Sequence, residues 1–384
     1  MNDIFVEVAH TQLSRYGEEL CGDSVSIEKD EQSTIISLSD GLGSGVKANI
    51  LSTLTTRIIV SMLKRNSPLD EVVDTLAETL PVCKVRKIAY STFSAIQVFQ
   101  NGEAYLAEFD CPPVFWIRSG RVMHVEGTER KIGNRVIHES NMKLRKNDWL
   151  VCVSDGIVHA GIGGVWNLGW RWEKIASFLE SSVNDHIDAE VLAKKIIETT
   201  DRLYKGMPGD DATCVVAKIR PPRRMILWAG PPEKASQDMM VTEKFLAYPG
   251  KKVLSGGTTG NIVSRFIGKT IEVNLDSMKE DIPPVGVLPG VDLVTEGILT
   301  LAAVRRLLKH GVTMEDVIYK TDGACRLLVL FLESDEISVI TGMAINPAHQ
   351  NPKLSGDLSL KARILEEITG ELVKLGKKVT MEYF

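Results

Sequence analysis

IISLSDGLGSG, residues 35–45, is an apolar run that ends at Asp40-Gly41 and continues into a loop with three glycines in five positions. The same ending recurs in WLVCVSDGIVHAG, residues 149–161, where a second apolar run ends in Ser-Asp-Gly. Glycine beside an acid lets the backbone adopt conformations that other residues avoid, and it lets a carbonyl or a solvated ion come close. A single loop of this kind is usually a turn, but two of them at strand ends predict a functional site.

Four aspartates share this position at the ends of predicted strands. Asp40 and Asp155 follow strands, whereas Asp23 in CGDSVSI and Asp210 in PGDDATCVVAKI precede them. If these carboxylates converge, each pair about 4 Å apart repels by roughly 4 kcal/mol at an effective dielectric near 20, so only bound cations make the cluster tolerable. Oxygen ligands, with the Gly41 carbonyl as a further candidate, favour Mg²⁺ or Mn²⁺ over Zn²⁺, which prefers histidine or cysteine.

Composition limits the classes of protein to which the chain can belong. It has 384 residues, of which 44% are hydrophobic and 25% charged, as in an ordinary globular protein of two domains. A formal net charge of -5 argues against a nucleic-acid partner. The six cysteines form no CxxC pair, as expected for reduced cysteines. MNDIFVEVAH lacks the basic region of a signal peptide, and no apolar run approaches the roughly 18 residues that span a bilayer. We therefore expect a soluble, cytoplasmic protein without a membrane partner.

The pattern of predicted elements changes at KIRPPRRMILW, residues 218–228, where a proline pair interrupts two apolar runs. We place a domain boundary there, with one domain at 1–220 and a second at 224–384. Downstream, strands and helices alternate, which is typical of an α/β layer fold. Upstream, short alternating strands predominate, and they are predicted at 34–39, 91–99, 103–109, 113–118, 149–154 and 212–219.

The segment after the first Asp-Gly predicts a helix. Apolar residues recur there every fourth position, which predicts that one stripe faces a core. The stripe consists of Val46, Ile50, Leu54, Ile58 and Met62. A second helix is predicted to start in SPLDE, with Ser67 as the N-cap and Pro68 at the first helical position.

Five motifs in the first domain occur in a characteristic order: GDS, SDGLGSGVKANILS, CPPVFWIRSGRV, KLRKNDWLVCVSDGIVHAG and GDDATCVVAKI. With them, residues 1 to about 220 resemble the SpoIIE-like bacterial branch of the PP2C (PPM) metal-dependent serine/threonine phosphatases. The resemblance implies an α-β-β-α sandwich with a binuclear Mn²⁺ or Mg²⁺ centre at one edge of its two sheets. It implies that Asp40 bridges both ions, that Asp155 and Asp210 bind the first, and that Asp23 and the Gly41 carbonyl bind the second.

The resemblance also implies an activity. Asp40 and Asp155 would be the catalytic acids, and a metal-bound hydroxide would hydrolyse phosphoserine or phosphothreonine on a partner protein, as relatives do with anti-anti-sigma or STAS-type regulators. Asp211 is expected to have a structural role. The chain departs from eukaryotic relatives at Leu42, where they carry a histidine, and at Arg15, which is out of register with their phosphate-binding arginine. A catalytically weak or inactive binding module therefore stays an alternative.

The second domain contains KKVLSGGTTGNIVSRFIGKTIEV, which predicts a strand, a glycine loop, a helix and a strand. Free N–H groups at a helix start bind anions, so we expect either an anion site or an ordinary turn at Gly256, Gly257, Thr258 and Thr259. The loop is no Walker A motif, because Asn261 follows Gly260. The domain is predicted to be regulatory or ligand-sensing. Alternatively the protein is bifunctional and its C-terminal domain binds or acts on a phosphorylated small molecule, in which case Asp292 or Glu296 would act as a catalytic acid beside the two threonines.

Overall fold

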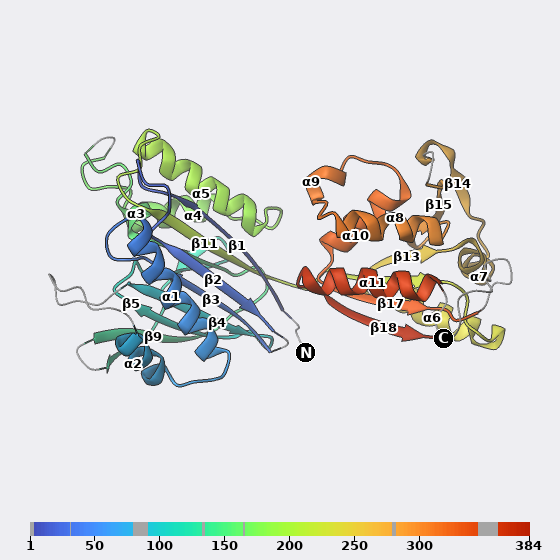
Figure 1. Cartoon of the computed structure of the whole chain (residues 1–384), viewed down its shortest axis with the longest axis horizontal. Helices are drawn as coiled ribbons and strands as arrows, with labels where there is room; N and C mark the ends of the chain where they lie inside the picture. Colours follow the sequence, from blue (N-terminus) through green and yellow to red (C-terminus); the bar gives the residue numbers. More distant parts are fainter. Residues whose placement is uncertain are drawn as a thin grey trace. The chain divides into compact units, whose positions relative to one another are not determined.

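The structure is a computed structural model that describes residues 4–30, 32–79, 91–132, 135–163, 166–278, 282–344 and 360–384. The chain divides into two compact units, Met1–Pro221 and Pro222–Phe384, drawn from blue to green and from yellow to red in Figure 1. We call them the N-terminal and C-terminal units. Five of the six cysteines are free thiols, and Cys83 lies outside the described residues.

Two antiparallel sheets form the centre of the N-terminal unit. The first has the strand order β1 (Phe5–Leu13), β11 (Ala212–Arg220), β10 (Trp149–Val153), β6 (Phe115–Arg118) and β7 (Arg121–Met123). The second has the order β2 (Ser24–Lys29), β3 (Ser33–Ser39), β4 (Phe93–Phe99), β5 (Glu103–Phe109), β9 (Arg135–Lys143) and β8 (Thr128–Ile132). The helices are α1 (Gly45–Leu63), α2 (Leu69–Thr79), α3 (Asp155–Val158), α4 (Trp172–Ser182) and α5 (Ala189–Tyr204).

Three apolar cores hold these layers together. Side chains of both sheets, such as Ile36 and Val215, fill the central core between the sheets. Helices α1 and α2 pack on the outer face of the second sheet, and α4 and α5 pack on the outer face of the first. Figure 1 shows α5 and α1 on opposite sides of the strands. The unit is therefore an α-β-β-α sandwich, which confirms the predicted fold class.

The predicted stripe on α1 is wrong for the first half of this helix. Val46, Ile50 and Leu54 are 60%, 51% and 40% exposed. The buried positions there carry small or hydroxyl side chains that bond to the ends of the strands: Ser52 Oγ donates to the Gly22 carbonyl at 2.6 Å, and Thr56 pairs with Ser26. The second half of α1 enters the apolar core through Ile59, Val60 and Leu63, and the stripe residues Ile58 and Met62 pack against it, as does Leu51 from the first half.

The C-terminal unit contains one seven-stranded sheet. Its order is β14 (Glu272–Asn274), β15 (Val285–Leu288), β16 (Val291–Thr295), β13 (Lys251–Ser255), β12 (Arg224–Ala229), β17 (Glu336–Thr341) and β18 (Lys378–Tyr383). The strands from β16 to β18 are parallel, whereas β14 and β15 are antiparallel additions at one edge. The helices are α6 (Asp238–Ala247), α7 (Gly257–Ile267), α8 (Ile298–Lys309), α9 (Met314–Val317), α10 (Gly323–Glu333) and α11 (Leu360–Lys374).

Helices cover both faces of this sheet. Residues of α6 and α7 pack on one face, and residues of α8, α10 and α11 pack on the other. The first strand, β12, lies between β13 and β17, so the chain order reverses at the middle of the sheet. The C-terminal unit is thus a doubly wound α/β domain, in agreement with the predicted second α/β domain.

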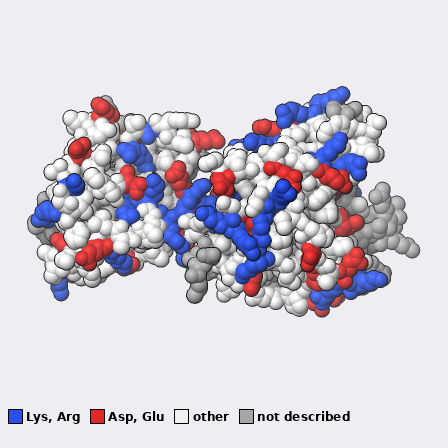
Figure 2. All heavy atoms as spheres, turned by 180° about the vertical axis from the view of Figure 1, so that it is seen from behind, with Lys and Arg blue, Asp and Glu red and all other residues white. Residues whose placement is uncertain are grey.

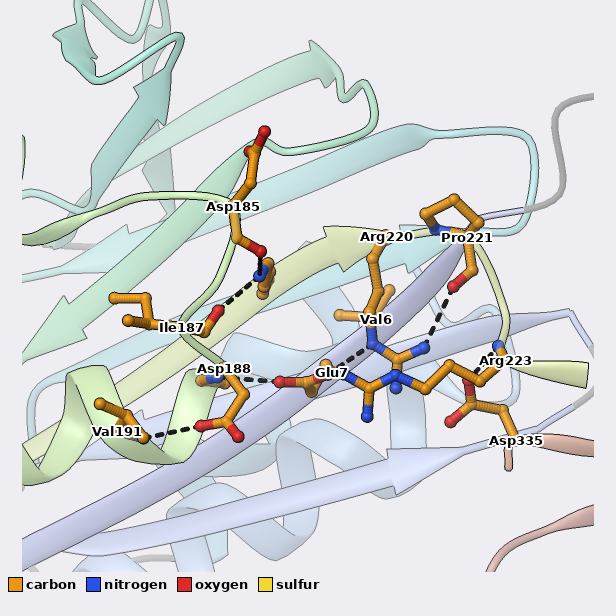
Figure 3. Close-up of polar contacts among 12 residues, drawn as sticks. Val6, Glu7, Asp185, Ile187, Asp188, Val191, Arg220, Pro221, Arg223 and Asp335 are labelled. Atoms are coloured by element: carbon orange, nitrogen blue, oxygen red, sulfur yellow. Dashed lines mark hydrogen bonds and ion pairs between the residues drawn. The ribbon is translucent and has the colours of Figure 1, made fainter. Parts of the chain in front are cut away.

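The peptide between the units is short, and each side of it is held by its own unit. Figure 3 shows Arg220 at the end of β11 with its guanidinium directed at Glu7 of β1, with which it forms an ion pair. On the other side of Pro221 and Pro222, the backbone N–H of Arg223 donates to Asp335 at 2.6 Å. Between these two anchors lies only the proline pair, and the Pro221 carbonyl itself accepts a hydrogen bond from Arg220 Nη1 at 3.1 Å.

Candidate metal centre

Strand pairing brings the four predicted acids to one end of each sheet. Ser24 pairs with Ser39 in the second sheet, so Asp23 before β2 lies next to Asp40 after β3. In the first sheet, β10 runs antiparallel to β11, and this pairing continues past the strand end because the Ser154 N–H donates to the Thr213 carbonyl at 2.9 Å. Asp155 and Asp210 therefore lie together at the same end.

Both Asp-Gly glycines are required by close backbone contacts. A Cβ atom on Gly41 would lie 2.1 Å from the carbonyl oxygen of Ala48 in α1. A Cβ atom on Gly156 would lie 2.0 Å from the carbonyl oxygen of Asp211. Any larger residue would push α1 or α3 away from the strand ends, so the two glycines fix the position of the acids that precede them.

The electrostatics of Asp40 show how closely the carboxylates approach. Burial, reinforced by the charges of Asp23, Asp155 and Asp210, raises the pKa of Asp40 to about 9. A hydrogen bond to Asp155 further favours its protonated form. A carboxyl group with so high a pKa holds a proton at neutral pH when no cation is bound. Asp40, directly after β3, is therefore the residue on which the charges of the other three acids act together.

Asp23 and Asp211 carry the unpaired oxygens of this region. Neither carboxylate oxygen of Asp23, a residue only 2% exposed, has a hydrogen-bond partner among the described residues. Burial raises the pKa of Asp23 to about 6; the nearby Ser154 and Thr213 side chains oppose this effect, and the charges of Asp211 and Asp155 add to it. Asp211 accepts a hydrogen bond from the backbone N–H of Arg15 at 2.9 Å through one oxygen, while its other oxygen has no partner in the described chain.

This donor set fits divalent cations such as Mg²⁺ and Mn²⁺, because all the candidate ligands are hard oxygens. A bound cation would also offset the repulsion between the carboxylate charges. Within the described residues, however, no three Asp, Glu, His or Cys side chains already form a closed ligand set. The acids are near enough to shift one another's pKa but are not gathered around a single point.

Arg15 lies nearer to the cluster than its register in the sequence indicates. Its backbone holds Asp211, and its positive charge lowers the pKa of Asp210, against the larger upward effects of burial and of Asp155. The Arg15 side chain is exposed. The sequence did not predict that Arg15 lies near the acids, because the irregular segment between β1 and β2 that carries it contains no recognisable motif. Leu42, directly after Gly41, and His159, three residues after Gly156, are both exposed.

In the C-terminal unit, the predicted anion loop lies between the end of β13 and the start of α7. Gly257 and Thr258 are exposed, whereas Thr259 is fully buried. Asp292 does not lie beside these threonines: its carboxylate accepts hydrogen bonds from Lys251 Nζ and the Lys252 N–H, both at 2.8 Å, near the opposite end of the strands. The prediction of a catalytic role for Asp292 is therefore wrong.

The surface shows charges of both signs. On the face in Figure 2, Lys and Arg side chains occur together with Asp and Glu side chains over each unit. No helix in the described ranges has the length and apolar character needed to cross a bilayer.

Comparison with known proteins gives the family of the N-terminal unit. Residues 30–220 match the family model described as Stage II sporulation protein E (SpoIIE). The chain is similar to Stage II sporulation protein E of Priestia megaterium, with 26% identity over 229 residues, which are 56% of this chain and 36% of that protein. It is also similar to the Bacillus subtilis protein of the same name, with 26% identity over 223 residues, which are 56% of this chain and 26% of that protein.

Among solved structures, the chain is similar to the PP2C phosphatase domain with a fragment of the regulatory domain of SpoIIE from Bacillus subtilis. The TM-score is 0.49, the identity is 22%, and the match covers 58% of this chain and 64% of that one. The chain thus spans only about a third or less of the length of the curated relatives it matches.

Proposed function

Because residues 30–220 belong to the SpoIIE-like branch of the PP2C phosphatases, we propose that this chain hydrolyses phosphoserine or phosphothreonine on a partner protein with the help of two Mn²⁺ or Mg²⁺ ions. The observation that carries the proposal is the crowding of buried carboxylates at one end of the sandwich, where the pKa of Asp40 rises to about 9. A fold that keeps such a repulsive cluster has a use for cations there.

The proposed ligands come from both sheets. Asp40 would contact both ions, Asp155 and Asp210 would bind one of them, and Asp23 and the Gly41 carbonyl would bind the other. When bound, the ions supply an activated water and neutralise charge on the phosphoryl group. The two unpaired oxygens of Asp23 support this assignment, because buried carboxylate oxygens normally have partners.

The chain's own contribution is positioning. The short contacts at Gly41 and Gly156 fix the two Asp-Gly loops to α1 and to the start of β11. Asp211 holds the backbone of Arg15, which leaves the exposed guanidinium free to meet the phosphate of an incoming phosphoprotein. We assign Arg15 to phosphate binding on this basis, and Asp211 to positioning it. An anti-anti-sigma or STAS-type regulator is the proposed class of substrate.

The test is hydrolysis of an aryl phosphate and of a phosphoserine peptide in Mn²⁺, with wild type, Asp40→Asn and Asp74→Asn. Asp74 is an exposed acid on α2 outside the cluster, so its variant is the matched control. We expect Asp40→Asn to reduce turnover to background and to weaken Mn²⁺ binding in calorimetry, with the control unchanged. Full turnover by Asp40→Asn would show that the chemistry lies elsewhere. Mn²⁺ binding without turnover in the wild type would favour the inactive binding module.

A further inference from the structure

The carboxyl ends of the parallel strands in the C-terminal unit form an edge with unusual side chains. The last residues of β16, β13, β12 and β17 pair in register, as Thr295–Ser255, Ser255–Ala229 and Ala229–Thr341. In doubly wound sheets, the crevice outside the carboxyl ends is where ligands bind, at the point where the chain order reverses. Here three of the four strands at that point end in a hydroxyl side chain rather than an apolar one.

Most of these hydroxyls have no partner. Four buried hydroxyls of the unit lack a hydrogen bond within the described part of the chain: Ser255, Thr259, Thr300 and Thr341. They are between 0% and 2% exposed. Buried hydroxyls in native proteins are nearly always paired. In the N-terminal unit, unpaired oxygens of Asp23 and Asp211 likewise lie at the candidate metal centre.

Two helix N-termini meet at the same edge. The N-caps of α7 and α8 are Gly256 and Gly297, with φ of 115° and 142°, and neither helix has a side-chain cap. Their loops touch: the Gly256 N–H donates to the Thr295 carbonyl at 2.9 Å, and a Cβ atom on Gly297 would lie 3.4 Å from Gly256 Cα. The uncapped N–H groups of both first turns therefore lie close to one another, and their dipoles favour an anion.

The unpaired hydroxyl of Thr259 lies against this pair of loops. A Cβ atom on Gly256 would lie 3.5 Å from Thr259 Oγ1. Gly257 is exposed, and apart from its chain neighbours and the backbone of α7 itself, no heavy atom of the described chain lies within 4 Å of the place where its Cβ would be. The site thus has a buried donor at its base and open space at its mouth.

A lysine adds positive charge on the neighbouring strands. Lys361 Nζ donates to the Gly342 carbonyl after β17 at 2.6 Å, beside Gly230, whose N–H donates to the Ser255 carbonyl at 3.3 Å. Burial lowers the pKa of Lys361, so an anion nearby would stabilise its charged form. Glu296, the acid that immediately precedes the Gly297 N-cap of α8, is exposed.

We propose that this edge binds the phosphate group of a phosphorylated small molecule. The N–H groups of Gly257 and Thr258 and the hydroxyls of Thr259 and Ser255 are the donors, with Lys361 supplying charge on the side of β12. The site lies outside residues 30–220, so it is independent of the proposed phosphatase centre.

The experiment is calorimetric titration of the full chain with inorganic phosphate, ribose 5-phosphate and AMP. EDTA is present throughout, and the background is Asp40→Asn, so that the candidate metal centre cannot contribute. We expect saturable binding of at least one of the three. Binding should weaken about tenfold in Thr259→Val and Ser255→Ala, because each loses one hydrogen bond to a charged group. Ser334→Ala is the matched control, since Ser334 is also buried but donates to the Leu330 carbonyl.

Gly257→Asp keeps the proposal falsifiable if a threonine or serine variant misfolds. An aspartate at the first helical position favours the helix, and there is room for its side chain, so the variant should melt no lower than its parent. Its carboxylate would occupy the anion position, so we expect phosphate binding to disappear. Tighter binding of ribose 5-phosphate or AMP than of inorganic phosphate would show that the site also recognises the esterified group. No saturable binding of any probe, or binding that Gly257→Asp leaves intact, would overturn the proposal.

Discussion

At the scale of single residues, burial and mutual repulsion together raise the pKa values of the clustered aspartates. The pKa of Asp40 is raised to about 9 and that of Asp23 to about 6, with burial as the largest cause of both shifts. The unfolded chain has no such burial, so its aspartates titrate near pH 4. Between these pH values the folded protein binds more protons than the unfolded one. Its stability without a cation therefore falls as pH rises through this window.

We accordingly expect the melting temperature in EDTA to fall from pH 5 to pH 9, and to fall less in Asp40→Asn than in the wild type. At pH 9 the variant should be the more stable of the two, because it carries no charge to repel Asp155. Thermal melts at pH 5, 7 and 9 measure this, with Asp74→Asn as the control that should follow the wild type. Parallel pH profiles for wild type and Asp40→Asn would contradict the assignment of the raised pKa.

The sequence predicted the strand-end position of these aspartates, because the Asp-Gly pairs and the apolar runs before them are local patterns. It offered no reason to expect that a Cβ atom on Gly41 or Gly156 would lie only about 2 Å from the backbone of another segment, since that closeness depends on packing. The position of Arg15 near Asp210 also depends on a loop without regular structure, which no local pattern encodes.

At the scale of elements, α1 shows how a correct helix prediction can assign the wrong face. The fourfold spacing from Val46 predicted a helix, and a helix is present. Up to Thr56, its buried face includes Ala48, Ser52, Thr55 and Thr56 instead of Val46, Ile50 and Leu54. Small and hydroxyl side chains allow α1 to approach the strand ends and bond to them, as Ser52 does with Gly22. Hydrophobic periodicity cannot detect a face held by hydrogen bonds.

This arrangement predicts opposite responses at two isoleucines of α1. Ile59 is 1% exposed, so Ile59→Ala should cost about 2–5 kcal/mol of unfolding free energy. Ile50 is 51% exposed, so Ile50→Ala should change stability by less than about 0.5 kcal/mol. Urea unfolding in EDTA measures both. Equal losses of unfolding free energy in the two variants would mean that Ile50 is buried in the core, as the apolar stripe predicted.

At the scale of the whole molecule, two units with separate cores share one chain. Alternating strands and helices after the proline pair predicted the α/β character of the C-terminal unit. They could not predict that β12 lies between β13 and β17, because strand order arises from contacts distant in sequence. The unpaired hydroxyls at the carboxyl edge follow from that order, so the sequence pointed to the glycine loop alone.

If the C-terminal unit regulates the phosphatase, a ligand that binds its carboxyl edge should change the rate. We expect a saturating phosphorylated ligand to change phosphopeptide turnover by about fivefold or more, the usual range for linked sites. The same addition to Gly257→Asp should leave turnover unchanged, which separates regulation from direct inhibition at the metal centre. Equal effects on both proteins would mean that the units act independently.

The proline joint has a consequence for proteolysis. A protease needs several residues of exposed, unpaired chain in its active site, and such segments are where multidomain proteins are usually cut. Here the chain is held up to Arg220 by its contact with Glu7 and again from Arg223 by its bond to Asp335. The bond after Arg220 also precedes a proline, which trypsin-like enzymes do not accept. The joint therefore offers a protease little unpaired chain, and we expect limited trypsin digestion of the folded protein to separate the two units slowly.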